Sequence, residues 1–137
     1  MKTFLDTNVL VCWLDAGPRA DLVERLLAGD AVISVQVLNE FTNVLRKKRG
    51  TSLATIRELV DTLLQTCEVC DSTVRIHRAA LDLAARYKLG IYDASILAAA
   101  GESGCVVVYS EDMHRGMSIR MPKSLNDGIL SIRNPFL

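Results

Sequence analysis

The stretch CVVVY, at residues 105–109, decides the fold class because it is apolar throughout and rich in β-branched side chains. AVISV at residues 31–35 has nearly the same character, and KTFL at residues 2–5 is a shorter apolar run. Strands of a parallel sheet need such continuous apolar runs when both faces of the sheet are covered. We therefore expect three central strands here, and CEVC at 67–70 and ILSIR at 129–133 are weaker candidates.

Helical patterns fill the intervals between these strands. Apolar residues recur at helical spacing in five segments, at residues 18–28, 35–48, 52–66, 73–88 and 92–102. This alternation predicts right-handed βαβ crossovers and a doubly wound α/β fold, with helices flanking a mostly parallel sheet. Ligands of such sheets bind beyond the carboxyl ends of the strands. Residues 114–128 show neither pattern, so we expect an irregular loop there.

Size and composition restrict the class of protein. The chain has 137 residues, of which 50% are hydrophobic, and this predicts a single domain over residues 1–137. Sixteen basic residues balance sixteen acidic ones, so a nucleic acid would have to be held by a local basic patch or a metal ion. No apolar run approaches the ~20 residues that span a bilayer. An acid at position 6 interrupts any N-terminal signal pattern, so we expect no membrane association and a cytoplasmic location.

The four cysteines include one Cys-x-x-Cys pair, Cys67 and Cys70, a spacing that occurs in zinc and redox sites. A structural zinc site needs a second pair of ligands, and His77 and His114 are isolated from one another in sequence. A redox pair begins a helix, whereas CEVC has the pattern of a short strand. We therefore favour ordinary buried or half-buried thiols.

Two aspartates follow predicted strands. Asp6 comes directly after the first strand, and Asp112 lies three residues beyond Tyr109, which ends another. Both positions belong to the edge of the sheet where ligands bind. Asp6 also precedes Thr7 and Asn8 at the start of a further apolar segment, so helix capping alone would explain it too.

Two further acids lie on predicted helices. In the helix that begins at residue 35, the apolar side chains share an arc of roughly 120°, and Glu40 lies at its border. A surface position explains Glu40 equally well. Asp93 stands in the first turn of a helix whose apolar stripe should face the sheet, so we expect a costly, partly buried carboxylate that needs a cation. An interaction with the helix dipole is the alternative.

Together the four acids indicate a metal site. Mg²⁺ prefers carboxylate oxygens and water, and one or two acids usually anchor it beside substrate phosphates. Four candidate acids at one edge of a sheet are more than a single Mg²⁺ ion needs. The excess fits two metal ions, or one metal ion with a general base, acting on a phosphodiester. Mg²⁺ is the expected cofactor, with Mn²⁺ as the alternative.

Five short motifs surround these acids in order along the chain. They are FLDTNVLV at 4–11, VLNEF at 37–41, GIYDASILAAA at 90–100, YSEDM at 109–113 followed by Gly116, and NPF at 134–136. In this order they resemble the PIN-domain family, and more narrowly the VapC-type toxins of bacterial and archaeal toxin–antitoxin pairs. The resemblance covers essentially the whole chain and implies a three-layer, Rossmann-like fold with about five strands.

The resemblance also implies roles for individual residues. The acidic cluster that binds the metal would consist of Asp6, Glu40, Asp93 and Asp112, with Asp6 and Asp93 as the most direct ligands. Supporting polar groups that hold the carboxylates or water would be Thr7, Asn8 and Ser110. Many relatives read Thr-x-Asp-x-Asp-Phe where this chain reads SEDMH at residues 110–114. Asp112 is the fourth acid by spacing, and Glu111 stays the alternative.

The activity that the resemblance implies is that of an endoribonuclease. Mg²⁺ would activate water for attack on an RNA phosphodiester, and Glu40 or Asp112 would accept the proton. Such a toxin would be blocked by a small cognate antitoxin and would form a homodimer. The basic cluster from Arg46 to Arg49 would contact RNA or an acidic partner, although cations that end a helix also complement its dipole. His114 and Arg115 are placed to touch the substrate, and a surface loop explains them equally.

Two other classes of protein remain. A haloacid-dehalogenase-like phosphatase also has an aspartate at the end of its first strand, but it needs a second aspartate two residues later, where this chain has Asn8. A PIN module without catalysis would only bind RNA or protein. A cleavage assay separates these possibilities from a ribonuclease.

Overall fold

The computed structural model describes residues 1–113 and 116–137, and within them one sheet has six strands in the order β3-β2-β1-β4-β6-β5. The strands are β1 (Thr3–Leu5), β2 (Ala31–Ser34), β3 (Glu68–Cys70), β4 (Val107–Tyr109), β5 (Ser118–Arg120) and β6 (Ile129–Arg133). Four of the neighbouring pairs are parallel, and only β5 and β6 run antiparallel. The carboxyl ends of the five parallel strands therefore share one edge.

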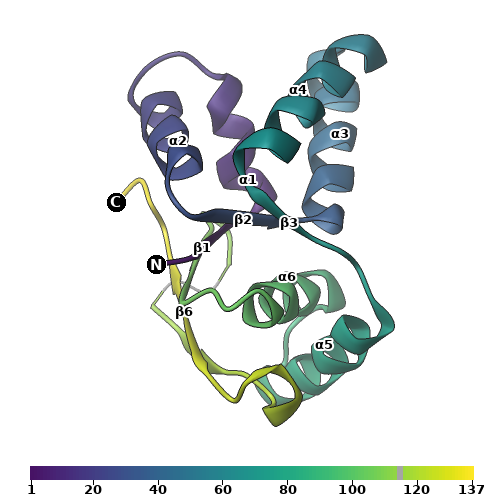
Figure 1. The fold of residues 1–137 in the computed structure, drawn as a ribbon, viewed down its shortest axis with the longest axis vertical. Helices are drawn as coiled ribbons and strands as arrows, with labels where there is room; N and C mark the ends of the chain where they lie inside the picture. The colour runs from purple at the N-terminus through teal and green to yellow at the C-terminus, as the bar shows by residue number, and fades with distance from the viewer. Residues whose placement is uncertain (114–115) are drawn as a thin grey trace.

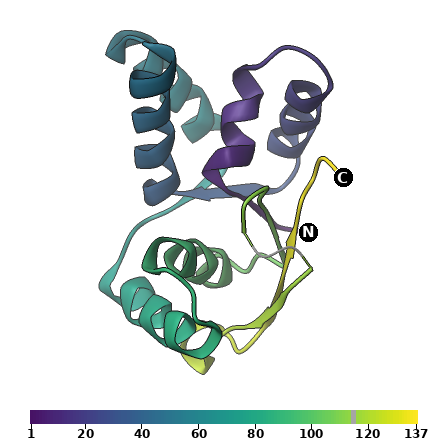
Figure 2. The same cartoon turned by 180° about the vertical axis from the view of Figure 1, so that it is seen from behind.

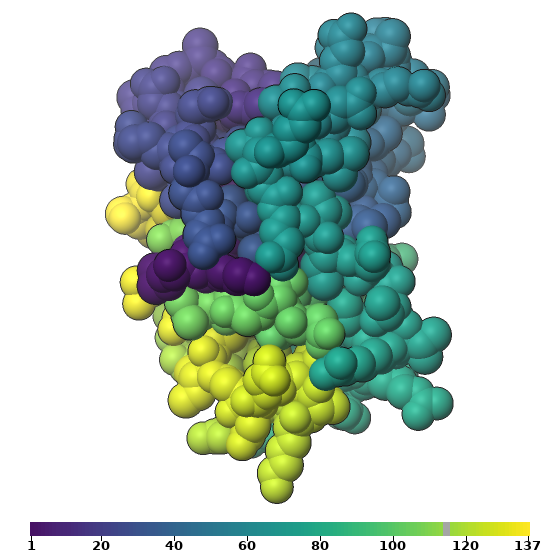
Figure 3. All heavy atoms as spheres, in the orientation of Figure 1, coloured from purple at the N-terminus to yellow at the C-terminus, as the bar shows by residue number. Residues whose placement is uncertain are grey.

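Helices cover the sheet in two layers. They are α1 (Thr7–Leu10), α2 (Pro18–Ala28), α3 (Val35–Arg49), α4 (Leu53–Thr66), α5 (Val74–Tyr87) and α6 (Ile91–Glu102), with short 3₁₀ helices η1 (Val11–Leu14) and η2 (Lys123–Leu125). Figures 1 and 2 show α1 to α4 on one side of the sheet and α5 and α6 on the other. In Figure 3 the purple N-terminal residues lie at the surface between these two layers. The α/β fold with its mostly parallel sheet is thus confirmed.

The central strands are apolar throughout because both of their faces are buried. Phe4 and Leu5 of β1, Val32 of β2 and Val108 of β4 have no exposed side-chain surface, although successive residues of a strand point to opposite faces. Burying both faces removes apolar surface from water on each side of the sheet, which favours folding by about 25 cal/mol per Å². The sheet is therefore a stiff base for residues at its edge.

Short polar side chains cap the first turns of three helices. The hydroxyl groups of Ser34, Ser52 and Thr73 each accept a hydrogen bond from a backbone N–H three residues later. These caps satisfy donors that the first turn of a helix otherwise leaves unpaired. Gly50 ends α3 with a φ of 61°, a left-handed conformation that glycine adopts without strain. The caps therefore define where α3, α4 and α5 begin, and α3 and α5 each follow a strand of the sheet.

One expectation about the chain's C-terminal part is wrong. Residues 116–128 are not an irregular loop, because they contain β5 and η2, while His114 and Arg115 lie outside the described residues. β5 adds one strand to the five expected. It has only three residues, of which Ile119 alone is buried, and it is held by antiparallel pairing with β6. Three residues are too few for a strand pattern to be recognised in the sequence, and β5 is defined by its pairing with β6.

The cysteines have the environment expected of ordinary thiols. Cys12 and Cys105 are buried, Cys67 and Cys70 are half-buried, and all four are free. Burial raises the pKa of Cys67 to about 11 and that of Cys105 to about 12, so these two thiols stay protonated near neutral pH. Thiols in this form are poor nucleophiles.

No helix in the described part of the chain is both long and apolar enough to cross a membrane.

Candidate active site

Asp6 is positioned by the pairing of β1 with β4. In this parallel pair Leu5 lies opposite Tyr109, and the backbone N–H of Asp6 donates to the carbonyl of Tyr109 over 3.0 Å. The next residues, Asp6 and Ser110, are therefore brought side by side although 104 positions separate them. The Ser110 hydroxyl donates to Asp6 Oδ2 over 2.8 Å, and the backbone N–H of Thr7 donates to Asp6 Oδ1 over 2.7 Å. Asp6 is thus both a helix cap and the innermost acid of the edge.

Glu40 is held on α3 by hydrogen bonds from two other side chains. Its Oε2 accepts from the Thr7 hydroxyl over 2.7 Å, and its Oε1 accepts from Gln36 Nε2 over 3.0 Å. Gln36 lies one helical turn before Glu40, and its amide also donates to the carbonyl of Tyr92 over 3.2 Å. The half-buried position of Glu40 agrees with its place at the border of the apolar arc. These bonds connect α1, α3 and α6 around one carboxylate.

All four acids line one pocket at the carboxyl edge of the sheet. Its volume is about 330 Å³, and its walls include Asp6, Glu40, Asp93 and Asp112 together with Lys48. Asp93 and Asp112 are exposed, at the first turn of α6 and in the bend after β4. The expected burial of Asp93 is therefore wrong. The first three residues of α6 are exposed, and the buried stripe of this helix begins only at Ala94.

The charges in this pocket favour a cation. Burial raises the pKa of Asp6 from 3.8 to about 6, hydrogen bonds from Ser110 and Thr7 oppose the rise, and the nearby charges of Glu40 and Asp93 add to it. A raised pKa means that the ionised form of Asp6 is unfavourable in the protein alone. A bound positive ion would remove that cost.

The polar neighbours of the acids organise the bend after β4. The Asn8 side chain donates to Ser110 Oγ over 3.2 Å and accepts from the backbone N–H of Glu111 over 3.0 Å. Ser110 Oγ also accepts from the backbone N–H of Met113 over 3.2 Å. Asn8 therefore uses both ends of its amide, a task that the aspartate of a haloacid-dehalogenase-like phosphatase could not perform because an ionised carboxylate has no donor.

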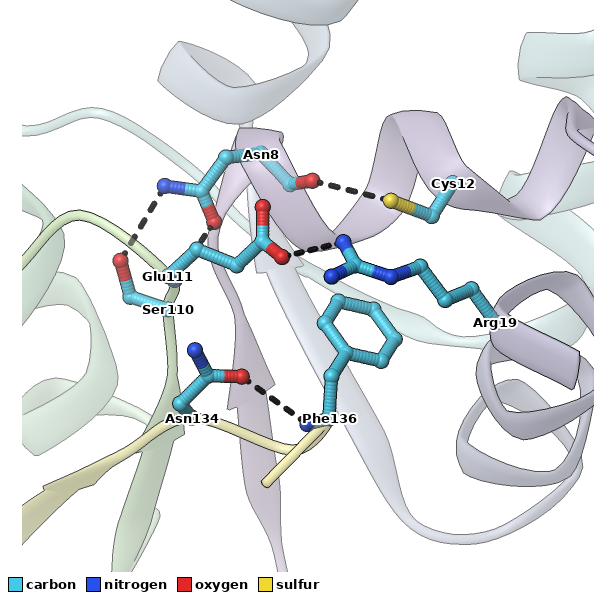
Figure 4. A network of polar contacts seen from close by, with 7 residues as sticks. All are labelled: Asn8, Cys12, Arg19, Ser110, Glu111, Asn134 and Phe136. Carbon is cyan, nitrogen blue, oxygen red and sulfur yellow. Dashed lines mark hydrogen bonds and ion pairs between the residues drawn. The ribbon is translucent and has the colours of Figure 1, made fainter.

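Glu111 and Asp112 point to different surroundings. Glu111 forms an ion pair and hydrogen bond with Arg19 at the start of α2, and the Arg19 guanidinium lies 4.5 Å from the centre of the Phe136 ring (Figure 4). Glu111 is absent from the lining of the acidic pocket, whereas Asp112 is part of it. The Arg19 contact thus ties the Glu111 side chain to α2 and to the chain's C-terminal residues.

The structure adds two residues that the sequence had not singled out for the acidic site. Gln36 could have been found because it lies one turn from Glu40 on the same face of α3. Lys48 lies two turns beyond Glu40 and alone of the basic cluster lines the acidic pocket. Arg49 pairs with Asp15 over 2.9 Å, and Arg46 and Lys47 border a separate shallow pocket on α3. The four basic residues from Arg46 to Arg49 therefore lie in three different environments.

The donor set of the pocket fits Mg²⁺ in chemical type. Its carboxylate oxygens are the hard ligands that Mg²⁺ prefers. Because Mg²⁺ keeps several bound waters, it needs only one or two carboxylates from the protein. Within residues 1–113 and 116–137, no three acidic, histidine or cysteine side chains are gathered closely enough to form a complete metal site. Asp6 and Glu40 are the less exposed of the four acids and accept hydrogen bonds from neighbouring side chains, whereas Asp93 and Asp112 are exposed to solvent.

Comparison with known proteins agrees with this geometry. A family profile described as PIN domain matches residues 3–115, a stretch that carries all four acids. The chain belongs to the PIN-domain family. A search of curated proteins found no match.

Solved structures similar to this PIN domain include several VapC toxins. The Mycobacterium tuberculosis toxin VapC20, described as cleaving the sarcin–ricin loop, has 23% identity and a TM-score of 0.64, with 81% of this chain and 90% of that chain covered. DNA-bound VapBC from Salmonella typhimurium has 21% identity, a TM-score of 0.65 and 98% coverage of both chains. VapBC-1 from nontypeable Haemophilus influenzae has 18% identity, a TM-score of 0.65 and full coverage of both. At such identities the likeness establishes the fold alone.

Proposed function

We propose that this PIN domain is a Mg²⁺-dependent endoribonuclease and the toxic member of a toxin–antitoxin pair. One observation carries the proposal: four acids from distant parts of the chain line a single pocket, where burial and like charges raise the pKa of Asp6 to about 6. Such a pocket suits a hydrated divalent cation, with Mn²⁺ as an alternative to Mg²⁺. The activity described for the M. tuberculosis relative agrees with an RNA substrate.

The acids have different tasks in this proposal. Asp6 and Asp93 would hold the cation, and Asn8 and Ser110 would keep Asp6 and the bend after β4 in position. When bound, Mg²⁺ makes water a stronger nucleophile and stabilises negative charge on the phosphate. Glu40 or Asp112 accepts the proton that the attacking water loses. Thr7 and Gln36 orient Glu40 for this step by donating to its two oxygens.

The reaction defines its products. The water oxygen forms a bond to phosphorus, the bond from phosphorus to O3′ breaks, and O3′ takes up a proton from solvent. The products carry a 5′-phosphate and a 3′-hydroxyl group. Attack by the ribose 2′-hydroxyl would instead leave a 2′,3′-cyclic phosphate, so that product would contradict the mechanism.

The decisive experiment uses purified protein and RNA that contains single-stranded loops. We expect cleavage with Mg²⁺, none after chelation, and none with the Asp6→Asn or Asp93→Asn variant. Circular dichroism of each variant checks that the fold is kept. A PIN module without catalysis would bind RNA without cutting it, and cleavage that survives both substitutions would contradict the site.

The toxin role predicts partners as well as a substrate. Similar structures were solved as toxin–antitoxin complexes, including one from Klebsiella pneumoniae and one from Rickettsia felis. We therefore propose a small antitoxin that covers the acidic pocket, and a homodimer of this chain. Expression of the chain alone should arrest growth, and co-expression of a small protein encoded next to it should relieve the arrest. An Asp6→Asn variant that still arrests growth would contradict a toxic ribonuclease.

A further inference from the structure

A second pocket lies beside the acidic one, on the other side of Gln36. Polar side chains surround its apolar floor, and we call it the Gln36 pocket after its lining residues Ser34, Gln36, Asp71, Ser72, His77 and Ala99. It lies where β2 and β3 end, next to the connection from β3 to α5 that Figure 1 shows passing to the lower layer. Of the described residues that line this pocket, only Gln36 takes part in the acidic site described above.

The size of the Gln36 pocket suits part of a larger ligand. Its volume is about 190 Å³. Sites that hold whole drug-sized molecules usually measure roughly 300–1,000 Å³. The pocket is therefore large enough for one part of a ligand, such as a ring, while the rest of that ligand is held elsewhere.

Gln36 and the first turn of α6 lie between the two pockets. The Gln36 amide donates to Glu40 Oε1 over 3.0 Å and to the carbonyl of Tyr92 over 3.2 Å. On α6, Asp93 lines the acidic pocket and Ser95, two residues later, lines the Gln36 pocket. A ligand with one group at the acids and its neighbour in the second pocket would pass over this turn.

Tyr92 adds an aromatic ring at that crossing. Its side chain is 72% exposed, and among the described residues it is the single aromatic in the set of strongly exposed large hydrophobic side chains. Proteins bind unstacked bases of single-stranded RNA on exposed aromatic rings of this kind. Tyr92 lies in the first turn of α6, where its backbone carbonyl accepts the hydrogen bond from Gln36, so its exposed ring extends from the turn that separates the two pockets.

The lining of the Gln36 pocket favours a base over a phosphate. Among the described residues that form it, Asp71 carries a negative charge and none is Lys or Arg. Ile76 and Ala99 give an apolar floor for a ring face, while Asp71 and His77 offer polar atoms to its edge. A phosphate would be repelled by Asp71, whereas a neutral base with N–H donors would not.

We propose that the Gln36 pocket and Tyr92 bind the base of a nucleotide next to the scissile phosphate in single-stranded RNA. This inference rests on the proposed ribonuclease function and adds to it a place where the enzyme recognises its substrate. Base recognition at this pocket gives the ribonuclease a preference for particular bases at one position next to the cleaved bond.

The test removes the base from the RNA and the ring from the protein, separately and together. The probe is a fluorescently labelled single-stranded RNA, compared with derivatives that carry one abasic nucleotide at each position. Loss of the bound base should weaken equilibrium binding to the wild-type protein roughly 5- to 150-fold, the range for one stacked base. Tyr92→Ala or His77→Ala should weaken binding of the intact RNA similarly, and the abasic change should then have a much smaller further effect.

Matched variants separate base recognition from general damage. Tyr92→Phe keeps the ring and should retain most of the binding. Asp82→Ala changes an exposed residue on α5 that does not line the Gln36 pocket, so it should behave as wild type. Tyr92 and His77 are exposed, so their removal should leave the melting temperature unchanged. Equal abasic effects in the wild type and in both alanine variants would overturn the proposal, as would failure of the wild type to bind the RNA.

A cleavage assay on the same RNAs distinguishes the two proposals. Cleavage by the wild type without coupling between base and pocket would contradict the Gln36 pocket alone. Coupled binding without any cleavage in Mg²⁺ would contradict the ribonuclease function and keep the base site.

Discussion

The four acids of the pocket form two pairs with different surroundings. The inner pair, Asp6 and Glu40, is held by hydrogen bonds from Ser110, Thr7 and Gln36, and Asp6 is only 8% exposed. The outer pair, Asp93 and Asp112, is exposed at the mouth of the pocket. The difference teaches that the fold buries one half of the site and leaves the other half open to solvent and to a ligand.

The largest effect is expected from the inner pair. Asp6→Asn removes the most buried charge in the pocket and should lower RNA cleavage by on the order of 10³-fold, which corresponds to several kcal/mol of transition-state stabilisation. Single-turnover cleavage in Mg²⁺ measures this loss, with circular dichroism to check the fold. Added Mg²⁺ should restore little activity. Full recovery at high Mg²⁺ would mean that Asp6 is no more important than the outer acids.

Stability of the metal-free protein should depend on pH through the same residue. The pKa of Asp6 is about 6 in the folded state and near 3.8 when unfolded, so the folded state binds more protons between these values. Its contribution to stability is therefore highest below pH 4 and falls as the pH rises to about 6, by up to roughly 3 kcal/mol. Denaturant titrations in chelator should show this fall in the wild type and a smaller one in Asp6→Asn. Identical pH profiles would contradict the raised pKa.

The outer pair should tolerate substitution better. Asp112→Asn should reduce cleavage by about 10²-fold, and high Mg²⁺ should restore part of the activity because the exposed site can rearrange. Glu111→Gln is the matched control next to it. Its ion pair is with the exposed Arg19, and ion pairs at the surface contribute little, so activity should change less than about fivefold. The opposite order of effects would make Glu111 the fourth acid.

The smallest effect is expected from a residue that acts through Glu40. Thr7→Val keeps the shape of the side chain but removes the hydroxyl that donates to Glu40 Oε2. Activity should fall by about 10- to 100-fold, as for other groups that orient catalytic carboxylates. Thr62→Val on α4 is the matched control, because the Thr62 hydroxyl only donates to the carbonyl of Glu58 within its own helix. Equal activity of both variants would remove Thr7 from the site.

The sequence by itself determined the fold class and the approximate positions of most elements. Continuous apolar runs such as residues 31–35 predicted the central strands, and the helical pattern over residues 35–48 predicted α3. These signals are local, because burial and capping act on neighbouring residues. The ordered motifs around Asp6 and Asp93 similarly pointed to the PIN family, which the family comparison then confirmed.

Only the tertiary structure decided how the acids meet. The register of β1 on β4 places Asp6 against Ser110, and Gln36 contacts Tyr92 because the first turns of α3 and α6 lie next to each other. The tertiary structure also separated Asp112 from Glu111. Asp112 lines the acidic pocket, whereas Glu111 pairs with Arg19. Such contacts join residues 56 to 104 positions apart, and a local pattern carries no information about them. The acids were therefore visible in the sequence, whereas the division into a fixed inner pair and an exposed outer pair was not.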